Sequence, residues 1–255
     1  MPDFRKPLYQ RYVSGFKTER NEQLSESALV WYKYKYLPLL SGVKPNDAIL
    51  DLGCGNGNLM QFFQRNGFIN VKGIDISPEQ INIAVSRGLD TYVADVFDFL
   101  PPREETFDVI FAIDVIEHFN KEEIISLFPI IHRSLKEGGR LILQTPNGQG
   151  LFPQQVIYGD FTHLTIFTPD SLRHILKIAG FDNIRFFETG PIPKKIKGVI
   201  RWILWRIVKG IANIFRKIEA GKTQEIWTEN MICSCYQSST RPQDTLVTSS
   251  FGGLI

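Results

Sequence analysis

From residue 48 onward, short apolar runs alternate with stretches whose apolar residues recur every three or four positions. The short runs are typical of buried strands, and the longer period is typical of amphipathic helices. The pattern predicts strands at Ala48–Leu52, Val71–Asp75, Thr91–Ala94, Phe107–Ile113, Gly139–Gln144, Asn183–Glu188 and Ile226–Tyr236. It predicts helices at Asn58–Arg65, Pro78–Arg87, Lys121–Leu135 and Pro169–Ala179. Strands that alternate with helices in this way form a doubly wound α/β fold with a mostly parallel sheet.

Turn signals support these boundaries. Ser77 and Thr168 each precede a proline, and a helix commonly begins with a hydroxyl cap followed by proline in its first turn. Gly138 and Gly180 follow predicted helices, where glycine commonly ends a helix. A long connection, 145–167, follows the fifth strand. Because ligands bind beyond the carboxyl ends of parallel strands, this connection is a candidate wall of a substrate site.

The remaining segments complete the organisation of the chain. Residues 1–42 are rich in aromatic side chains and are predicted to form a helical cover. Residues 43–190 and 226–237 form the predicted α/β domain. Residues 191–225 form a helical insertion, and residues 238–255, rich in serine and threonine, form a flexible tail. With 255 residues, of which 43% are hydrophobic and 22% charged, the chain has room for one domain with a sizeable core.

The first predicted strand runs directly into the glycine-rich turn Gly53-Cys54-Gly55-Asn56-Gly57. Glycine allows the backbone to turn sharply and lets a ligand approach closely. The helix that follows offers free N–H groups and a positive dipole end to an anionic group. The spacing is G-x-G-x-G with Asp51 two residues ahead, which differs from the G-x-G-x-x-G of dinucleotide-binding dehydrogenases.

The turn resembles motif I of the class I S-adenosylmethionine-dependent methyltransferases, and further matches follow in order over roughly residues 48 to 190. The resemblance implies S-adenosylmethionine as the cofactor. It places Gly53 and Gly55 beneath the methionine part and Asp51 at its amino group, directly or through water. Asp75 would accept hydrogen bonds from both ribose hydroxyls. The predicted cofactor residues are Asp51, Gly53, Gly55, Asp75, Ile76, Asp95, Val96 and Asp114.

Three of these residues have further implied roles. Ile76 would lie on the adenine face, and Asp95 with the backbone N–H of Val96 would meet the adenine edge. For the acids an ordinary alternative stays open, because an acid at a strand end often caps the next helix. Cys54 is interpreted as a small residue of the turn, not a nucleophile, since nothing near it in sequence would activate a thiol.

The predicted catalytic residues are Glu117, His118 and His163. Asp114 to Phe119 follows the fourth strand and resembles the ubiquinone-biosynthesis O-methyltransferases, in which an acid and a Glu-His pair are thought to bind a metal. This chain has Asp114 where those enzymes commonly have Glu, so no metal is assigned, and a Mg²⁺ site formed by Asp114, Glu117 and His118 stays open beside a purely structural role.

His163 lies in the loop after the fifth strand, followed by Phe-Thr-Pro and a helix that ends in Ala-Gly-Phe. This arrangement resembles small-molecule O-methyltransferases, including some from cell-surface polysaccharide clusters. Imidazole has a suitable pKa for accepting a hydroxyl proton. His132 and His174 are placed on the outer faces of their helices and are interpreted as structural.

Residues 194–219 carry eight basic residues and one acid on a helix with a wide apolar stripe. Lysine, arginine and tryptophan beside such a stripe are typical of a helix that lies on a membrane surface. The alternative is a helical cap whose stripe packs on the domain or on a second subunit. The oligomeric state is left open.

The remaining features set limits on the function. The net charge of +2 and the single basic segment do not favour a nucleic-acid partner. The three cysteines, with Cys233 and Cys235 only two apart, fit a reducing compartment. No signal peptide or apolar run of about 18 residues is found. We therefore expect a cytoplasmic O-methyltransferase, peripheral at the inner membrane face, with a small or lipid-linked acceptor such as a glycan or quinone precursor. A non-catalytic scaffold of the same fold is the alternative.

Overall fold

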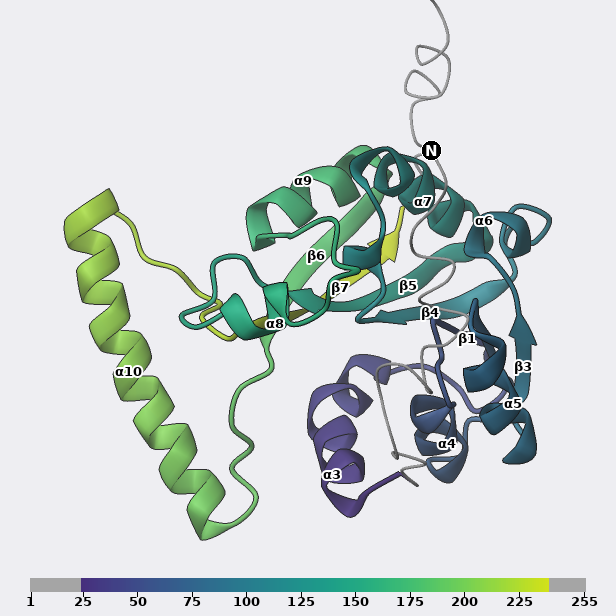
Figure 1. Cartoon of the computed structure of the whole chain (residues 1–255), viewed down its shortest axis with the longest axis horizontal. Coiled ribbons are helices and arrows are strands. Elements are labelled where there is room, and N and C mark those ends of the chain that lie inside the picture. Colours follow the sequence, from purple (N-terminus) through teal and green to yellow (C-terminus); the bar gives the residue numbers. More distant parts are fainter. Residues whose placement is uncertain (1–23, 239–255) are drawn as a thin grey trace, which may run out of the picture.

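The computed structural model describes residues 24–238, so the first part of the predicted cover and nearly all of the predicted tail lie outside the described residues. A seven-stranded sheet runs through the molecule in the order β3-β2-β1-β4-β5-β7-β6 (Figure 1). Its strands are β1 Ile49–Leu52, β2 Val71–Asp75, β3 Asp90–Val93, β4 Phe107–Ile113, β5 Leu135–Pro146, β6 Phe181–Glu188 and β7 Asn230–Gln237. Every strand predicted from the sequence is present.

The sheet is parallel except at one strand. β7 is inserted antiparallel between β5 and β6, with Cys233 opposite Leu143 on one side and Phe186 on the other. The carboxyl ends of β1, β2, β4, β5 and β6 therefore lie along the same edge of the sheet. The predicted doubly wound, mostly parallel α/β fold is confirmed.

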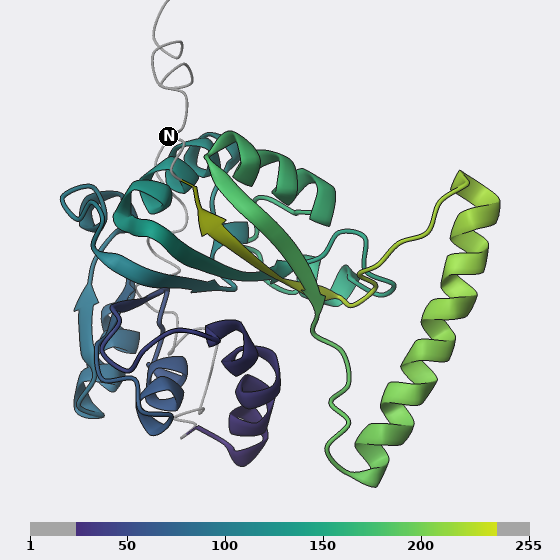
Figure 2. The same cartoon turned by 180° about the vertical axis from the view of Figure 1, so that it is seen from behind.

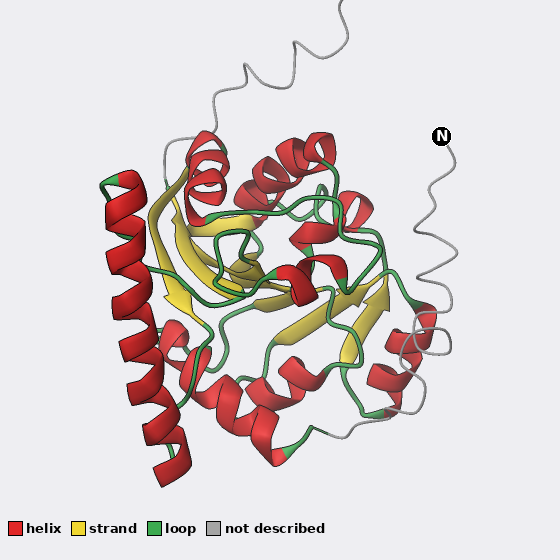
Figure 3. Ribbon diagram, turned by 60° about the vertical axis from the view of Figure 1, so that its left-hand side comes forward, coloured by secondary structure: helices red, strands yellow, loops and turns green. Residues whose placement is uncertain are grey.

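Helices cover both faces of the sheet, as the views from two sides show (Figures 1 and 3). α3, α4 and α5 lie on one face, and α7 and α9 lie on the other. Their bounds are α3 Glu26–Lys35, α4 Asn58–Arg65, α5 Pro78–Ser86, α7 Lys121–Ser134 and α9 Pro169–Ile178, and they agree with the pattern. Shorter elements that the pattern did not predict are η1 Leu37–Leu40, α6 Val96–Phe99, η2 Ile116–His118 and α8 Gln154–Tyr158.

The predicted caps begin their helices. The hydroxyls of Ser77 and Thr168 accept hydrogen bonds from backbone N–H groups in the first turns of α5 and α9. In α7 the side chain of Asn120 accepts from the Glu123 N–H, and the Glu123 carboxylate accepts from the Asn120 N–H. This reciprocal pair fixes the direction in which the chain leaves the fourth strand toward the helix.

Each face of the sheet has its own hydrophobic core. The end of α3 contributes Tyr36, which is fully buried and packs edge-on against Phe111 of β4. The described part of the N-terminal cover is thus packed into the core beneath β1 and β4. Through the hydroxyl of Tyr36, which donates to Gln144, it reaches the carboxyl end of β5.

The last strand is shorter than predicted. β7 begins at Asn230, and residues 226–229 instead run beside the connection that follows β5. The side chain of Asn147 donates to the carbonyls of Ile226 and Thr228, and the Leu151 N–H donates to the Trp227 carbonyl. These bonds satisfy backbone groups of residues 226–229 without a sheet ladder, which explains why this segment does not extend the strand.

The longest helix, α10 (Ile196–Ala220), stands at the edge of the molecule and is joined to it by two extended connections (Figure 2). Its half-buried positions are Gly198, Trp202, Trp205, Lys209, Ala212, Asn213 and Arg216, which recur every three or four residues and form the face toward the domain. At about 100° per residue, this face lies about 180° from the apolar stripe.

The apolar stripe of α10 is exposed along its whole length. Its eleven members are between 38% and 81% exposed: Ile196, Val199, Ile200, Ile203, Leu204, Ile207, Val208, Ile211, Ile214, Phe215 and Ile218. The alternative in which this stripe packs on its own domain is therefore wrong, because the helix docks through its polar and tryptophan-bearing side. Among the described residues, no helix has the length and apolarity needed to span a bilayer.

Candidate active site

The glycine turn after β1 adopts the conformation that its sequence requires. Gly53, Gly55 and Gly57 have φ values of 67°, 53° and 79°, in the left-handed region that favours glycine. A Cβ on Gly53 would lie 2.4 Å from a methyl carbon of Val115. Gly53 is therefore required both by its backbone conformation and by the close approach of the loop after β4.

Asp75 holds this turn in place. Its Oδ2 accepts a hydrogen bond from the Gly55 N–H at 3.0 Å, and its Oδ1 accepts from the Ser77 N–H at 2.8 Å. Ser77, and not Asp75, caps α5. The helix-cap alternative for Asp75 is thus wrong, and the carboxylate lies at the carboxyl end of β2 beside the glycine turn.

For Asp95 the helix-cap alternative holds. Its Oδ1 accepts from the Phe97 N–H at 2.9 Å and begins the short helix α6. Asp95 nevertheless lines the same cavity as Asp75, together with Val96. A carboxylate has acceptor capacity beyond one capping bond, so capping does not exclude a role toward a ligand.

A cavity of about 500 Å³ opens at the carboxyl ends of β1, β2 and β4. Among the described residues, its wall includes every predicted cofactor residue except Asp51: Gly53, Gly55, Asp75, Ile76, Asp95, Val96 and Asp114. His118 and Phe119 add the wall on the side of η2. The volume is in the range of small-ligand sites.

Asp51 lies behind the glycine turn and is only 2% exposed. Burial, and secondly the neighbouring Asp75, raise the pKa of Asp51 from 3.8 to about 8. Burial, followed by Asp51 and Asp114, also raises the pKa of Tyr32 to about 12. An electropositive ligand at this end of the cavity would favour the ionised form of Asp51.

Asp114 is oriented by two residues that the sequence did not single out. The Gln144 amide donates to both oxygens of Asp114 at 3.1 Å, and the Tyr36 hydroxyl donates to the Gln144 Oε1 at 2.9 Å. Asp114 has a φ of 54°, an uncommon conformation for a residue with a side chain. Tyr36 is 108 residues from Gln144, so only the fold brings them together.

The three predicted catalytic residues meet at η2. The ligand atoms of Glu117, His118 and His163 all lie within 4.8 Å of one another, and the two imidazole rings are 4.9 Å apart. His118 lines the cofactor cavity, whereas Glu117 and His163 lie behind it. The structure therefore groups His163, and not Asp114, with Glu117 and His118.

Glu117 is 1% exposed, and its Oε2 accepts from the Thr145 hydroxyl at 3.1 Å. Burial, and secondly Asp114, raise its pKa well above the usual range. If Glu117 ionises, its carboxylate with the two imidazoles is a donor set suited to a transition metal more than to Mg²⁺.

A hydrogen-bonded chain sets the tautomer of His118. The Thr162 hydroxyl donates its one hydrogen to the Asp160 carboxylate at 2.6 Å, so its oxygen must accept from the His118 Nδ1–H at 2.9 Å. Bonds from Thr162 lower the pKa of Asp160 against the opposing effect of burial, which keeps this carboxylate ionised. The proton therefore resides on Nδ1, and Nε2 is the basic nitrogen of His118.

Three other sequence interpretations concern residues that were not predicted to contact a ligand. His132 is not on an outer face: it is 2% exposed, and its Nε2 lies 3.1 Å from the Gly180 carbonyl oxygen. Its structural role stands, while its placement was wrong. His174 is exposed on α9, as predicted. Cys54 is buried, and burial raises its thiol pKa far above the usual value, in agreement with a small residue of the turn.

The sheet order, the glycine turn and the cavity at the strand ends together define the class I methyltransferase fold. The sequence model of a family described as "Methyltransferase domain" matches residues 27–185. This chain belongs to that family. The prediction of an S-adenosylmethionine-dependent methyltransferase domain is thereby confirmed.

Curated relatives match shorter parts of the chain. "Probable tRNA methyltransferase 9B" of Mus musculus is 34% identical over 105 residues, which are 41% of this chain and 23% of the relative. "Cyclopropane-fatty-acyl-phospholipid synthase" of Escherichia coli K12 is 32% identical over 141 residues, 54% of this chain and 35% of the relative. "Ubiquinone biosynthesis O-methyltransferase" of Xylella fastidiosa is 33% identical over 122 residues, 46% of each chain. The matches thus span less than half of each of these relatives.

Solved structures share the fold at low identity. A SAM-dependent methyltransferase from Archaeoglobus fulgidus superposes with a TM-score of 0.65 at 18% identity and covers 89% of this chain and 99% of its own. Phosphoethanolamine N-methyltransferase 2 of Haemonchus contortus, in complex with S-adenosyl-L-methionine, gives a TM-score of 0.59 at 16% identity, covering 91% of this chain and 60% of its own. Both confirm the fold.

Proposed function

We propose that this chain transfers the methyl group of S-adenosylmethionine to a hydroxyl of an acceptor that is held at a membrane surface, either a lipid-linked glycan or a quinone precursor. The observation that carries the proposal is the exposed apolar stripe of α10, which faces away from the domain. The cytoplasmic face of the membrane stays a prediction.

The chemical step needs positioning and one base. Bound S-adenosylmethionine would supply a methyl group on a positively charged sulfur, so the acceptor oxygen must be held in line with the sulfur–carbon bond that breaks, and uncharged thioether sulfur would remain in the product S-adenosylhomocysteine. The acceptor proton passes to Nε2 of His118, the predicted residue that lines the cavity and whose tautomer is fixed by Thr162. His163 supports the proton transfer from behind His118. The family's predicted contacts to the cofactor, including Asp51 at the amino group, belong to the same proposal.

The charge around the stripe supports a membrane occupant. Basic residues flank its two borders, with Lys197 and Arg201 on one side and Lys217 on the other. Anionic lipid attracts such residues, while the stripe lies among the acyl chains just below the head groups. The helix is about 37 Å long at 1.5 Å per residue, so it offers an extended contact in the membrane plane.

The names of some relatives support a membrane-resident acceptor. The Escherichia coli relative is named for fatty-acyl phospholipid, and the Xylella fastidiosa relative for O-methylation in ubiquinone biosynthesis. A different relative is named for tRNA, so the names do not decide the acceptor by themselves. The exposed apolar stripe of α10 favours a lipid acceptor over tRNA.

Co-sedimentation with vesicles tests the membrane part. Ile203, Ile207 and Ile211 are about half exposed, so insertion of the free half of each is worth about 1 kcal/mol. We expect the triple variant Ile203→Ser, Ile207→Ser, Ile211→Ser to lower partitioning into anionic vesicles about 100-fold. A matched control changes Ile69, Ile125 and Ile178 to serine. These three isoleucines are also exposed but do not belong to α10. Equal pelleting of both variants would refute the proposed contact.

Methyl transfer is tested with S-adenosylmethionine carrying a labelled methyl group, incubated with membrane lipids or with the soluble extract of the same cells. Label in an organic-phase product supports the lipid-linked acceptor, and label only in the aqueous phase contradicts it. The alternative, a non-catalytic scaffold, predicts cofactor binding with transfer to neither fraction.

A further inference from the structure

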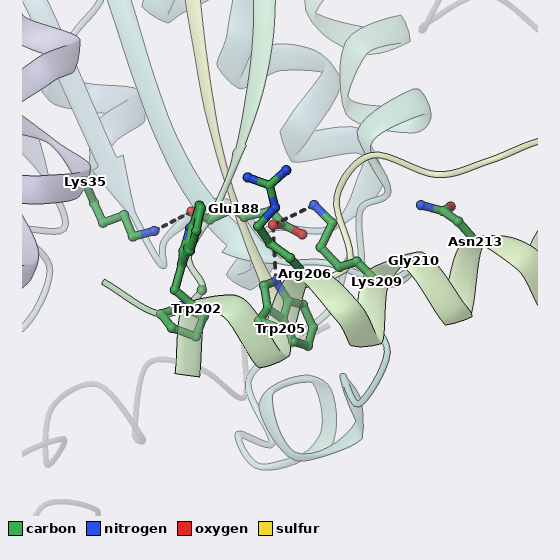
Figure 4. Close-up of a pocket in the computed structure, with 10 residues that line it drawn as sticks. Lys35, Glu188, Trp202, Trp205, Arg206, Lys209, Gly210 and Asn213 are labelled. Atoms are coloured by element: carbon green, nitrogen blue, oxygen red, sulfur yellow. Dashed lines mark hydrogen bonds and ion pairs between the residues drawn. The ribbon is translucent and has the colours of Figure 1, made fainter. Parts of the chain in front are cut away.

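A second cavity, of about 490 Å³, lies between α10 and the domain, apart from the cofactor cavity. Its walls come from three elements distant in sequence: Lys35 of α3, Glu188 at the end of β6, and Trp202, Trp205, Arg206 and Lys209 of α10 (Figure 4). We call it the basic pocket. Because β6 ends at the same sheet edge as β4 and β5, the basic pocket and the cofactor cavity share that edge.

Glu188 is fully used in holding α10 to the domain. Its Oε2 accepts from the indole N–H of Trp205 at 3.2 Å and pairs with Lys209 at 2.8 Å, as the dashed lines in Figure 4 mark. Its Oε1 accepts from the Trp227 N–H at 2.9 Å. This carboxylate positions the helix, and one cation, Lys209, is neutralised by it.

Two further cations of the basic pocket lack a carboxylate of their own. Lys35 donates to the backbone carbonyl of Glu188 at 2.9 Å, and burial lowers its pKa more than the nearby Glu188 raises it. The Arg206 guanidinium lies 4.9 Å from the Trp202 ring centroid. Among residues 24–238, neither Lys35 nor Arg206 forms a salt bridge with a carboxylate.

The pocket is shaped as well as charged. A Cβ on Gly190 would lie 3.3 Å from the Trp205 indole nitrogen and 3.2 Å from a Thr228 methyl carbon, so glycine allows the indole to pack closely against the end of β6. Trp202 and Trp205 give the pocket flat aromatic walls. Its volume exceeds what one phosphate requires and leaves room for an attached polar group.

We propose that the basic pocket binds a phosphate group, in the form of a phosphate carried by a lipid. Its excess positive charge suits an anion, and guanidinium and ammonium groups are the usual protein partners of phosphate. The pocket lies on the polar side of the helix, opposite the stripe that is proposed to enter the membrane, so it is directed away from the acyl chains and toward the charged surface. This inference rests on the lipid-linked form of the proposed function, since the phosphate would be the part of a lipid-linked acceptor that the protein recognises.

Calorimetry with monomeric short-chain ligands tests the pocket without a membrane. The probes are dihexanoyl phosphatidic acid, dihexanoyl glycerol without phosphate, and glycerol 3-phosphate without acyl chains. We expect the wild-type protein to bind phosphatidic acid at least tenfold more tightly than dihexanoyl glycerol. If glycerol 3-phosphate binds as tightly as phosphatidic acid, the lipid source is overturned and a soluble phosphate ester takes its place. If dihexanoyl phosphatidic acid and dihexanoyl glycerol bind equally tightly, the proposed phosphate site is wrong.

Variants locate the binding. Lys35→Gln with Arg206→Gln removes the two unneutralised charges while keeping the Glu188 contacts of α10, and should weaken phosphatidic acid binding at least tenfold. The matched control, Lys33→Gln with Arg201→Gln, removes the same charges from exposed positions on the same two helices. It should change binding less than twofold, and equal loss in both overturns the pocket. The wild-type comparison of ligands needs no variant, so it decides the question even if a variant unfolds.

The membrane contact and the pocket fail independently. The triple serine variant of the stripe should still bind monomeric phosphatidic acid, because its changed side chains face away from the pocket. If the stripe does not bind vesicles but the pocket binds phosphate, the proposed membrane surface is wrong and the phosphate site stands. If vesicles bind and phosphate does not, the pocket is wrong.

Discussion

The buried carboxyl of Asp51 has a measurable consequence for stability. Its folded-state pKa of about 8 is far above the value of about 3.9 in an unfolded chain. Between these values the folded protein keeps a proton that the unfolded chain has lost. The folded state thus binds more protons, and stability falls as the pH rises through this window. The slope is about 1.4 kcal/mol per pH unit, or about 3 kcal/mol between about pH 5 and about pH 7.

Asp51→Asn removes this titration. We expect the free energy of unfolding of the cofactor-free variant, measured by urea denaturation, to lose about 3 kcal/mol less than the wild type between about pH 5 and about pH 7. A constant offset from the amide does not matter, because only the slopes are compared. Saturating S-adenosylmethionine should flatten the wild-type slope if its amino group lies at Asp51 as proposed, since a nearby ammonium favours the ionised carboxylate.

The control is Asp170→Asn, which removes an exposed carboxylate from the first turn of α9. It should leave the wild-type slope unchanged. If the unfolding free energies of wild type and Asp51→Asn run parallel with pH, the burial of Asp51 behind the glycine turn does not shift its titration, and the reasoning is wrong.

Further predictions concern the same site. Gly53→Ala should destabilise the protein by about 2 to 3 kcal/mol in urea denaturation, because it adds left-handed strain of about 1 to 2 kcal/mol and a clash with Val115. Tyr36→Phe should lower the free energy of unfolding by about 1 to 3 kcal/mol, since it leaves a buried amide oxygen of β5 without its donor; an unchanged value would show that water replaces the hydroxyl. His118→Ala and His163→Ala should each lower turnover about 10²- to 10⁴-fold with little change in cofactor affinity; wild-type turnover in both variants would contradict their catalytic assignment.

The strands and long helices were predictable because their patterns are local. Ile49–Leu52 and Phe107–Ile113 are buried, largely apolar runs. Ser77 and Thr168 cap their helices by accepting a hydrogen bond from the backbone N–H three residues later. The helix α6 was not predicted because four residues are too few to show a helical repeat of apolar positions. Its beginning is marked by the capping bond of Asp95.

The site was predictable in its residue types but not in its contacts. Asp75 and Gly53 follow from a motif, whereas the chain from Tyr36 through Gln144 to Asp114 joins residues far apart in sequence. His132 was misplaced although a signal existed: it stands four residues after the buried Phe128 and so on the same face of α7. Its buried Nε2 is paired with the carbonyl of Gly180, directly before β6, and no local sequence pattern predicts that contact.

For α10 the pattern predicted the helix but could not give its orientation. An apolar stripe is normally the side that a helix buries against its own domain. Here the bonds of Glu188 to Trp205 and Lys209 select the opposite side. Trp205 and Lys209 lie 17 and 21 residues after Glu188 in the chain, so no local sequence pattern predicts these contacts.

The antiparallel strand β7 gives this enzyme a modular architecture. Glu188, the last residue of β6, is directly opposite Met231 near the start of β7, so the intervening segment leaves and re-enters the sheet at neighbouring points. Its length is therefore uncoupled from the cofactor-binding half of the molecule. Residues 190–223 can therefore be exchanged for another insert while residues 224–229, which bond to Asn147 and Gln149, are kept, so that the outer surface of the protein changes and the strand ends around the cofactor cavity do not.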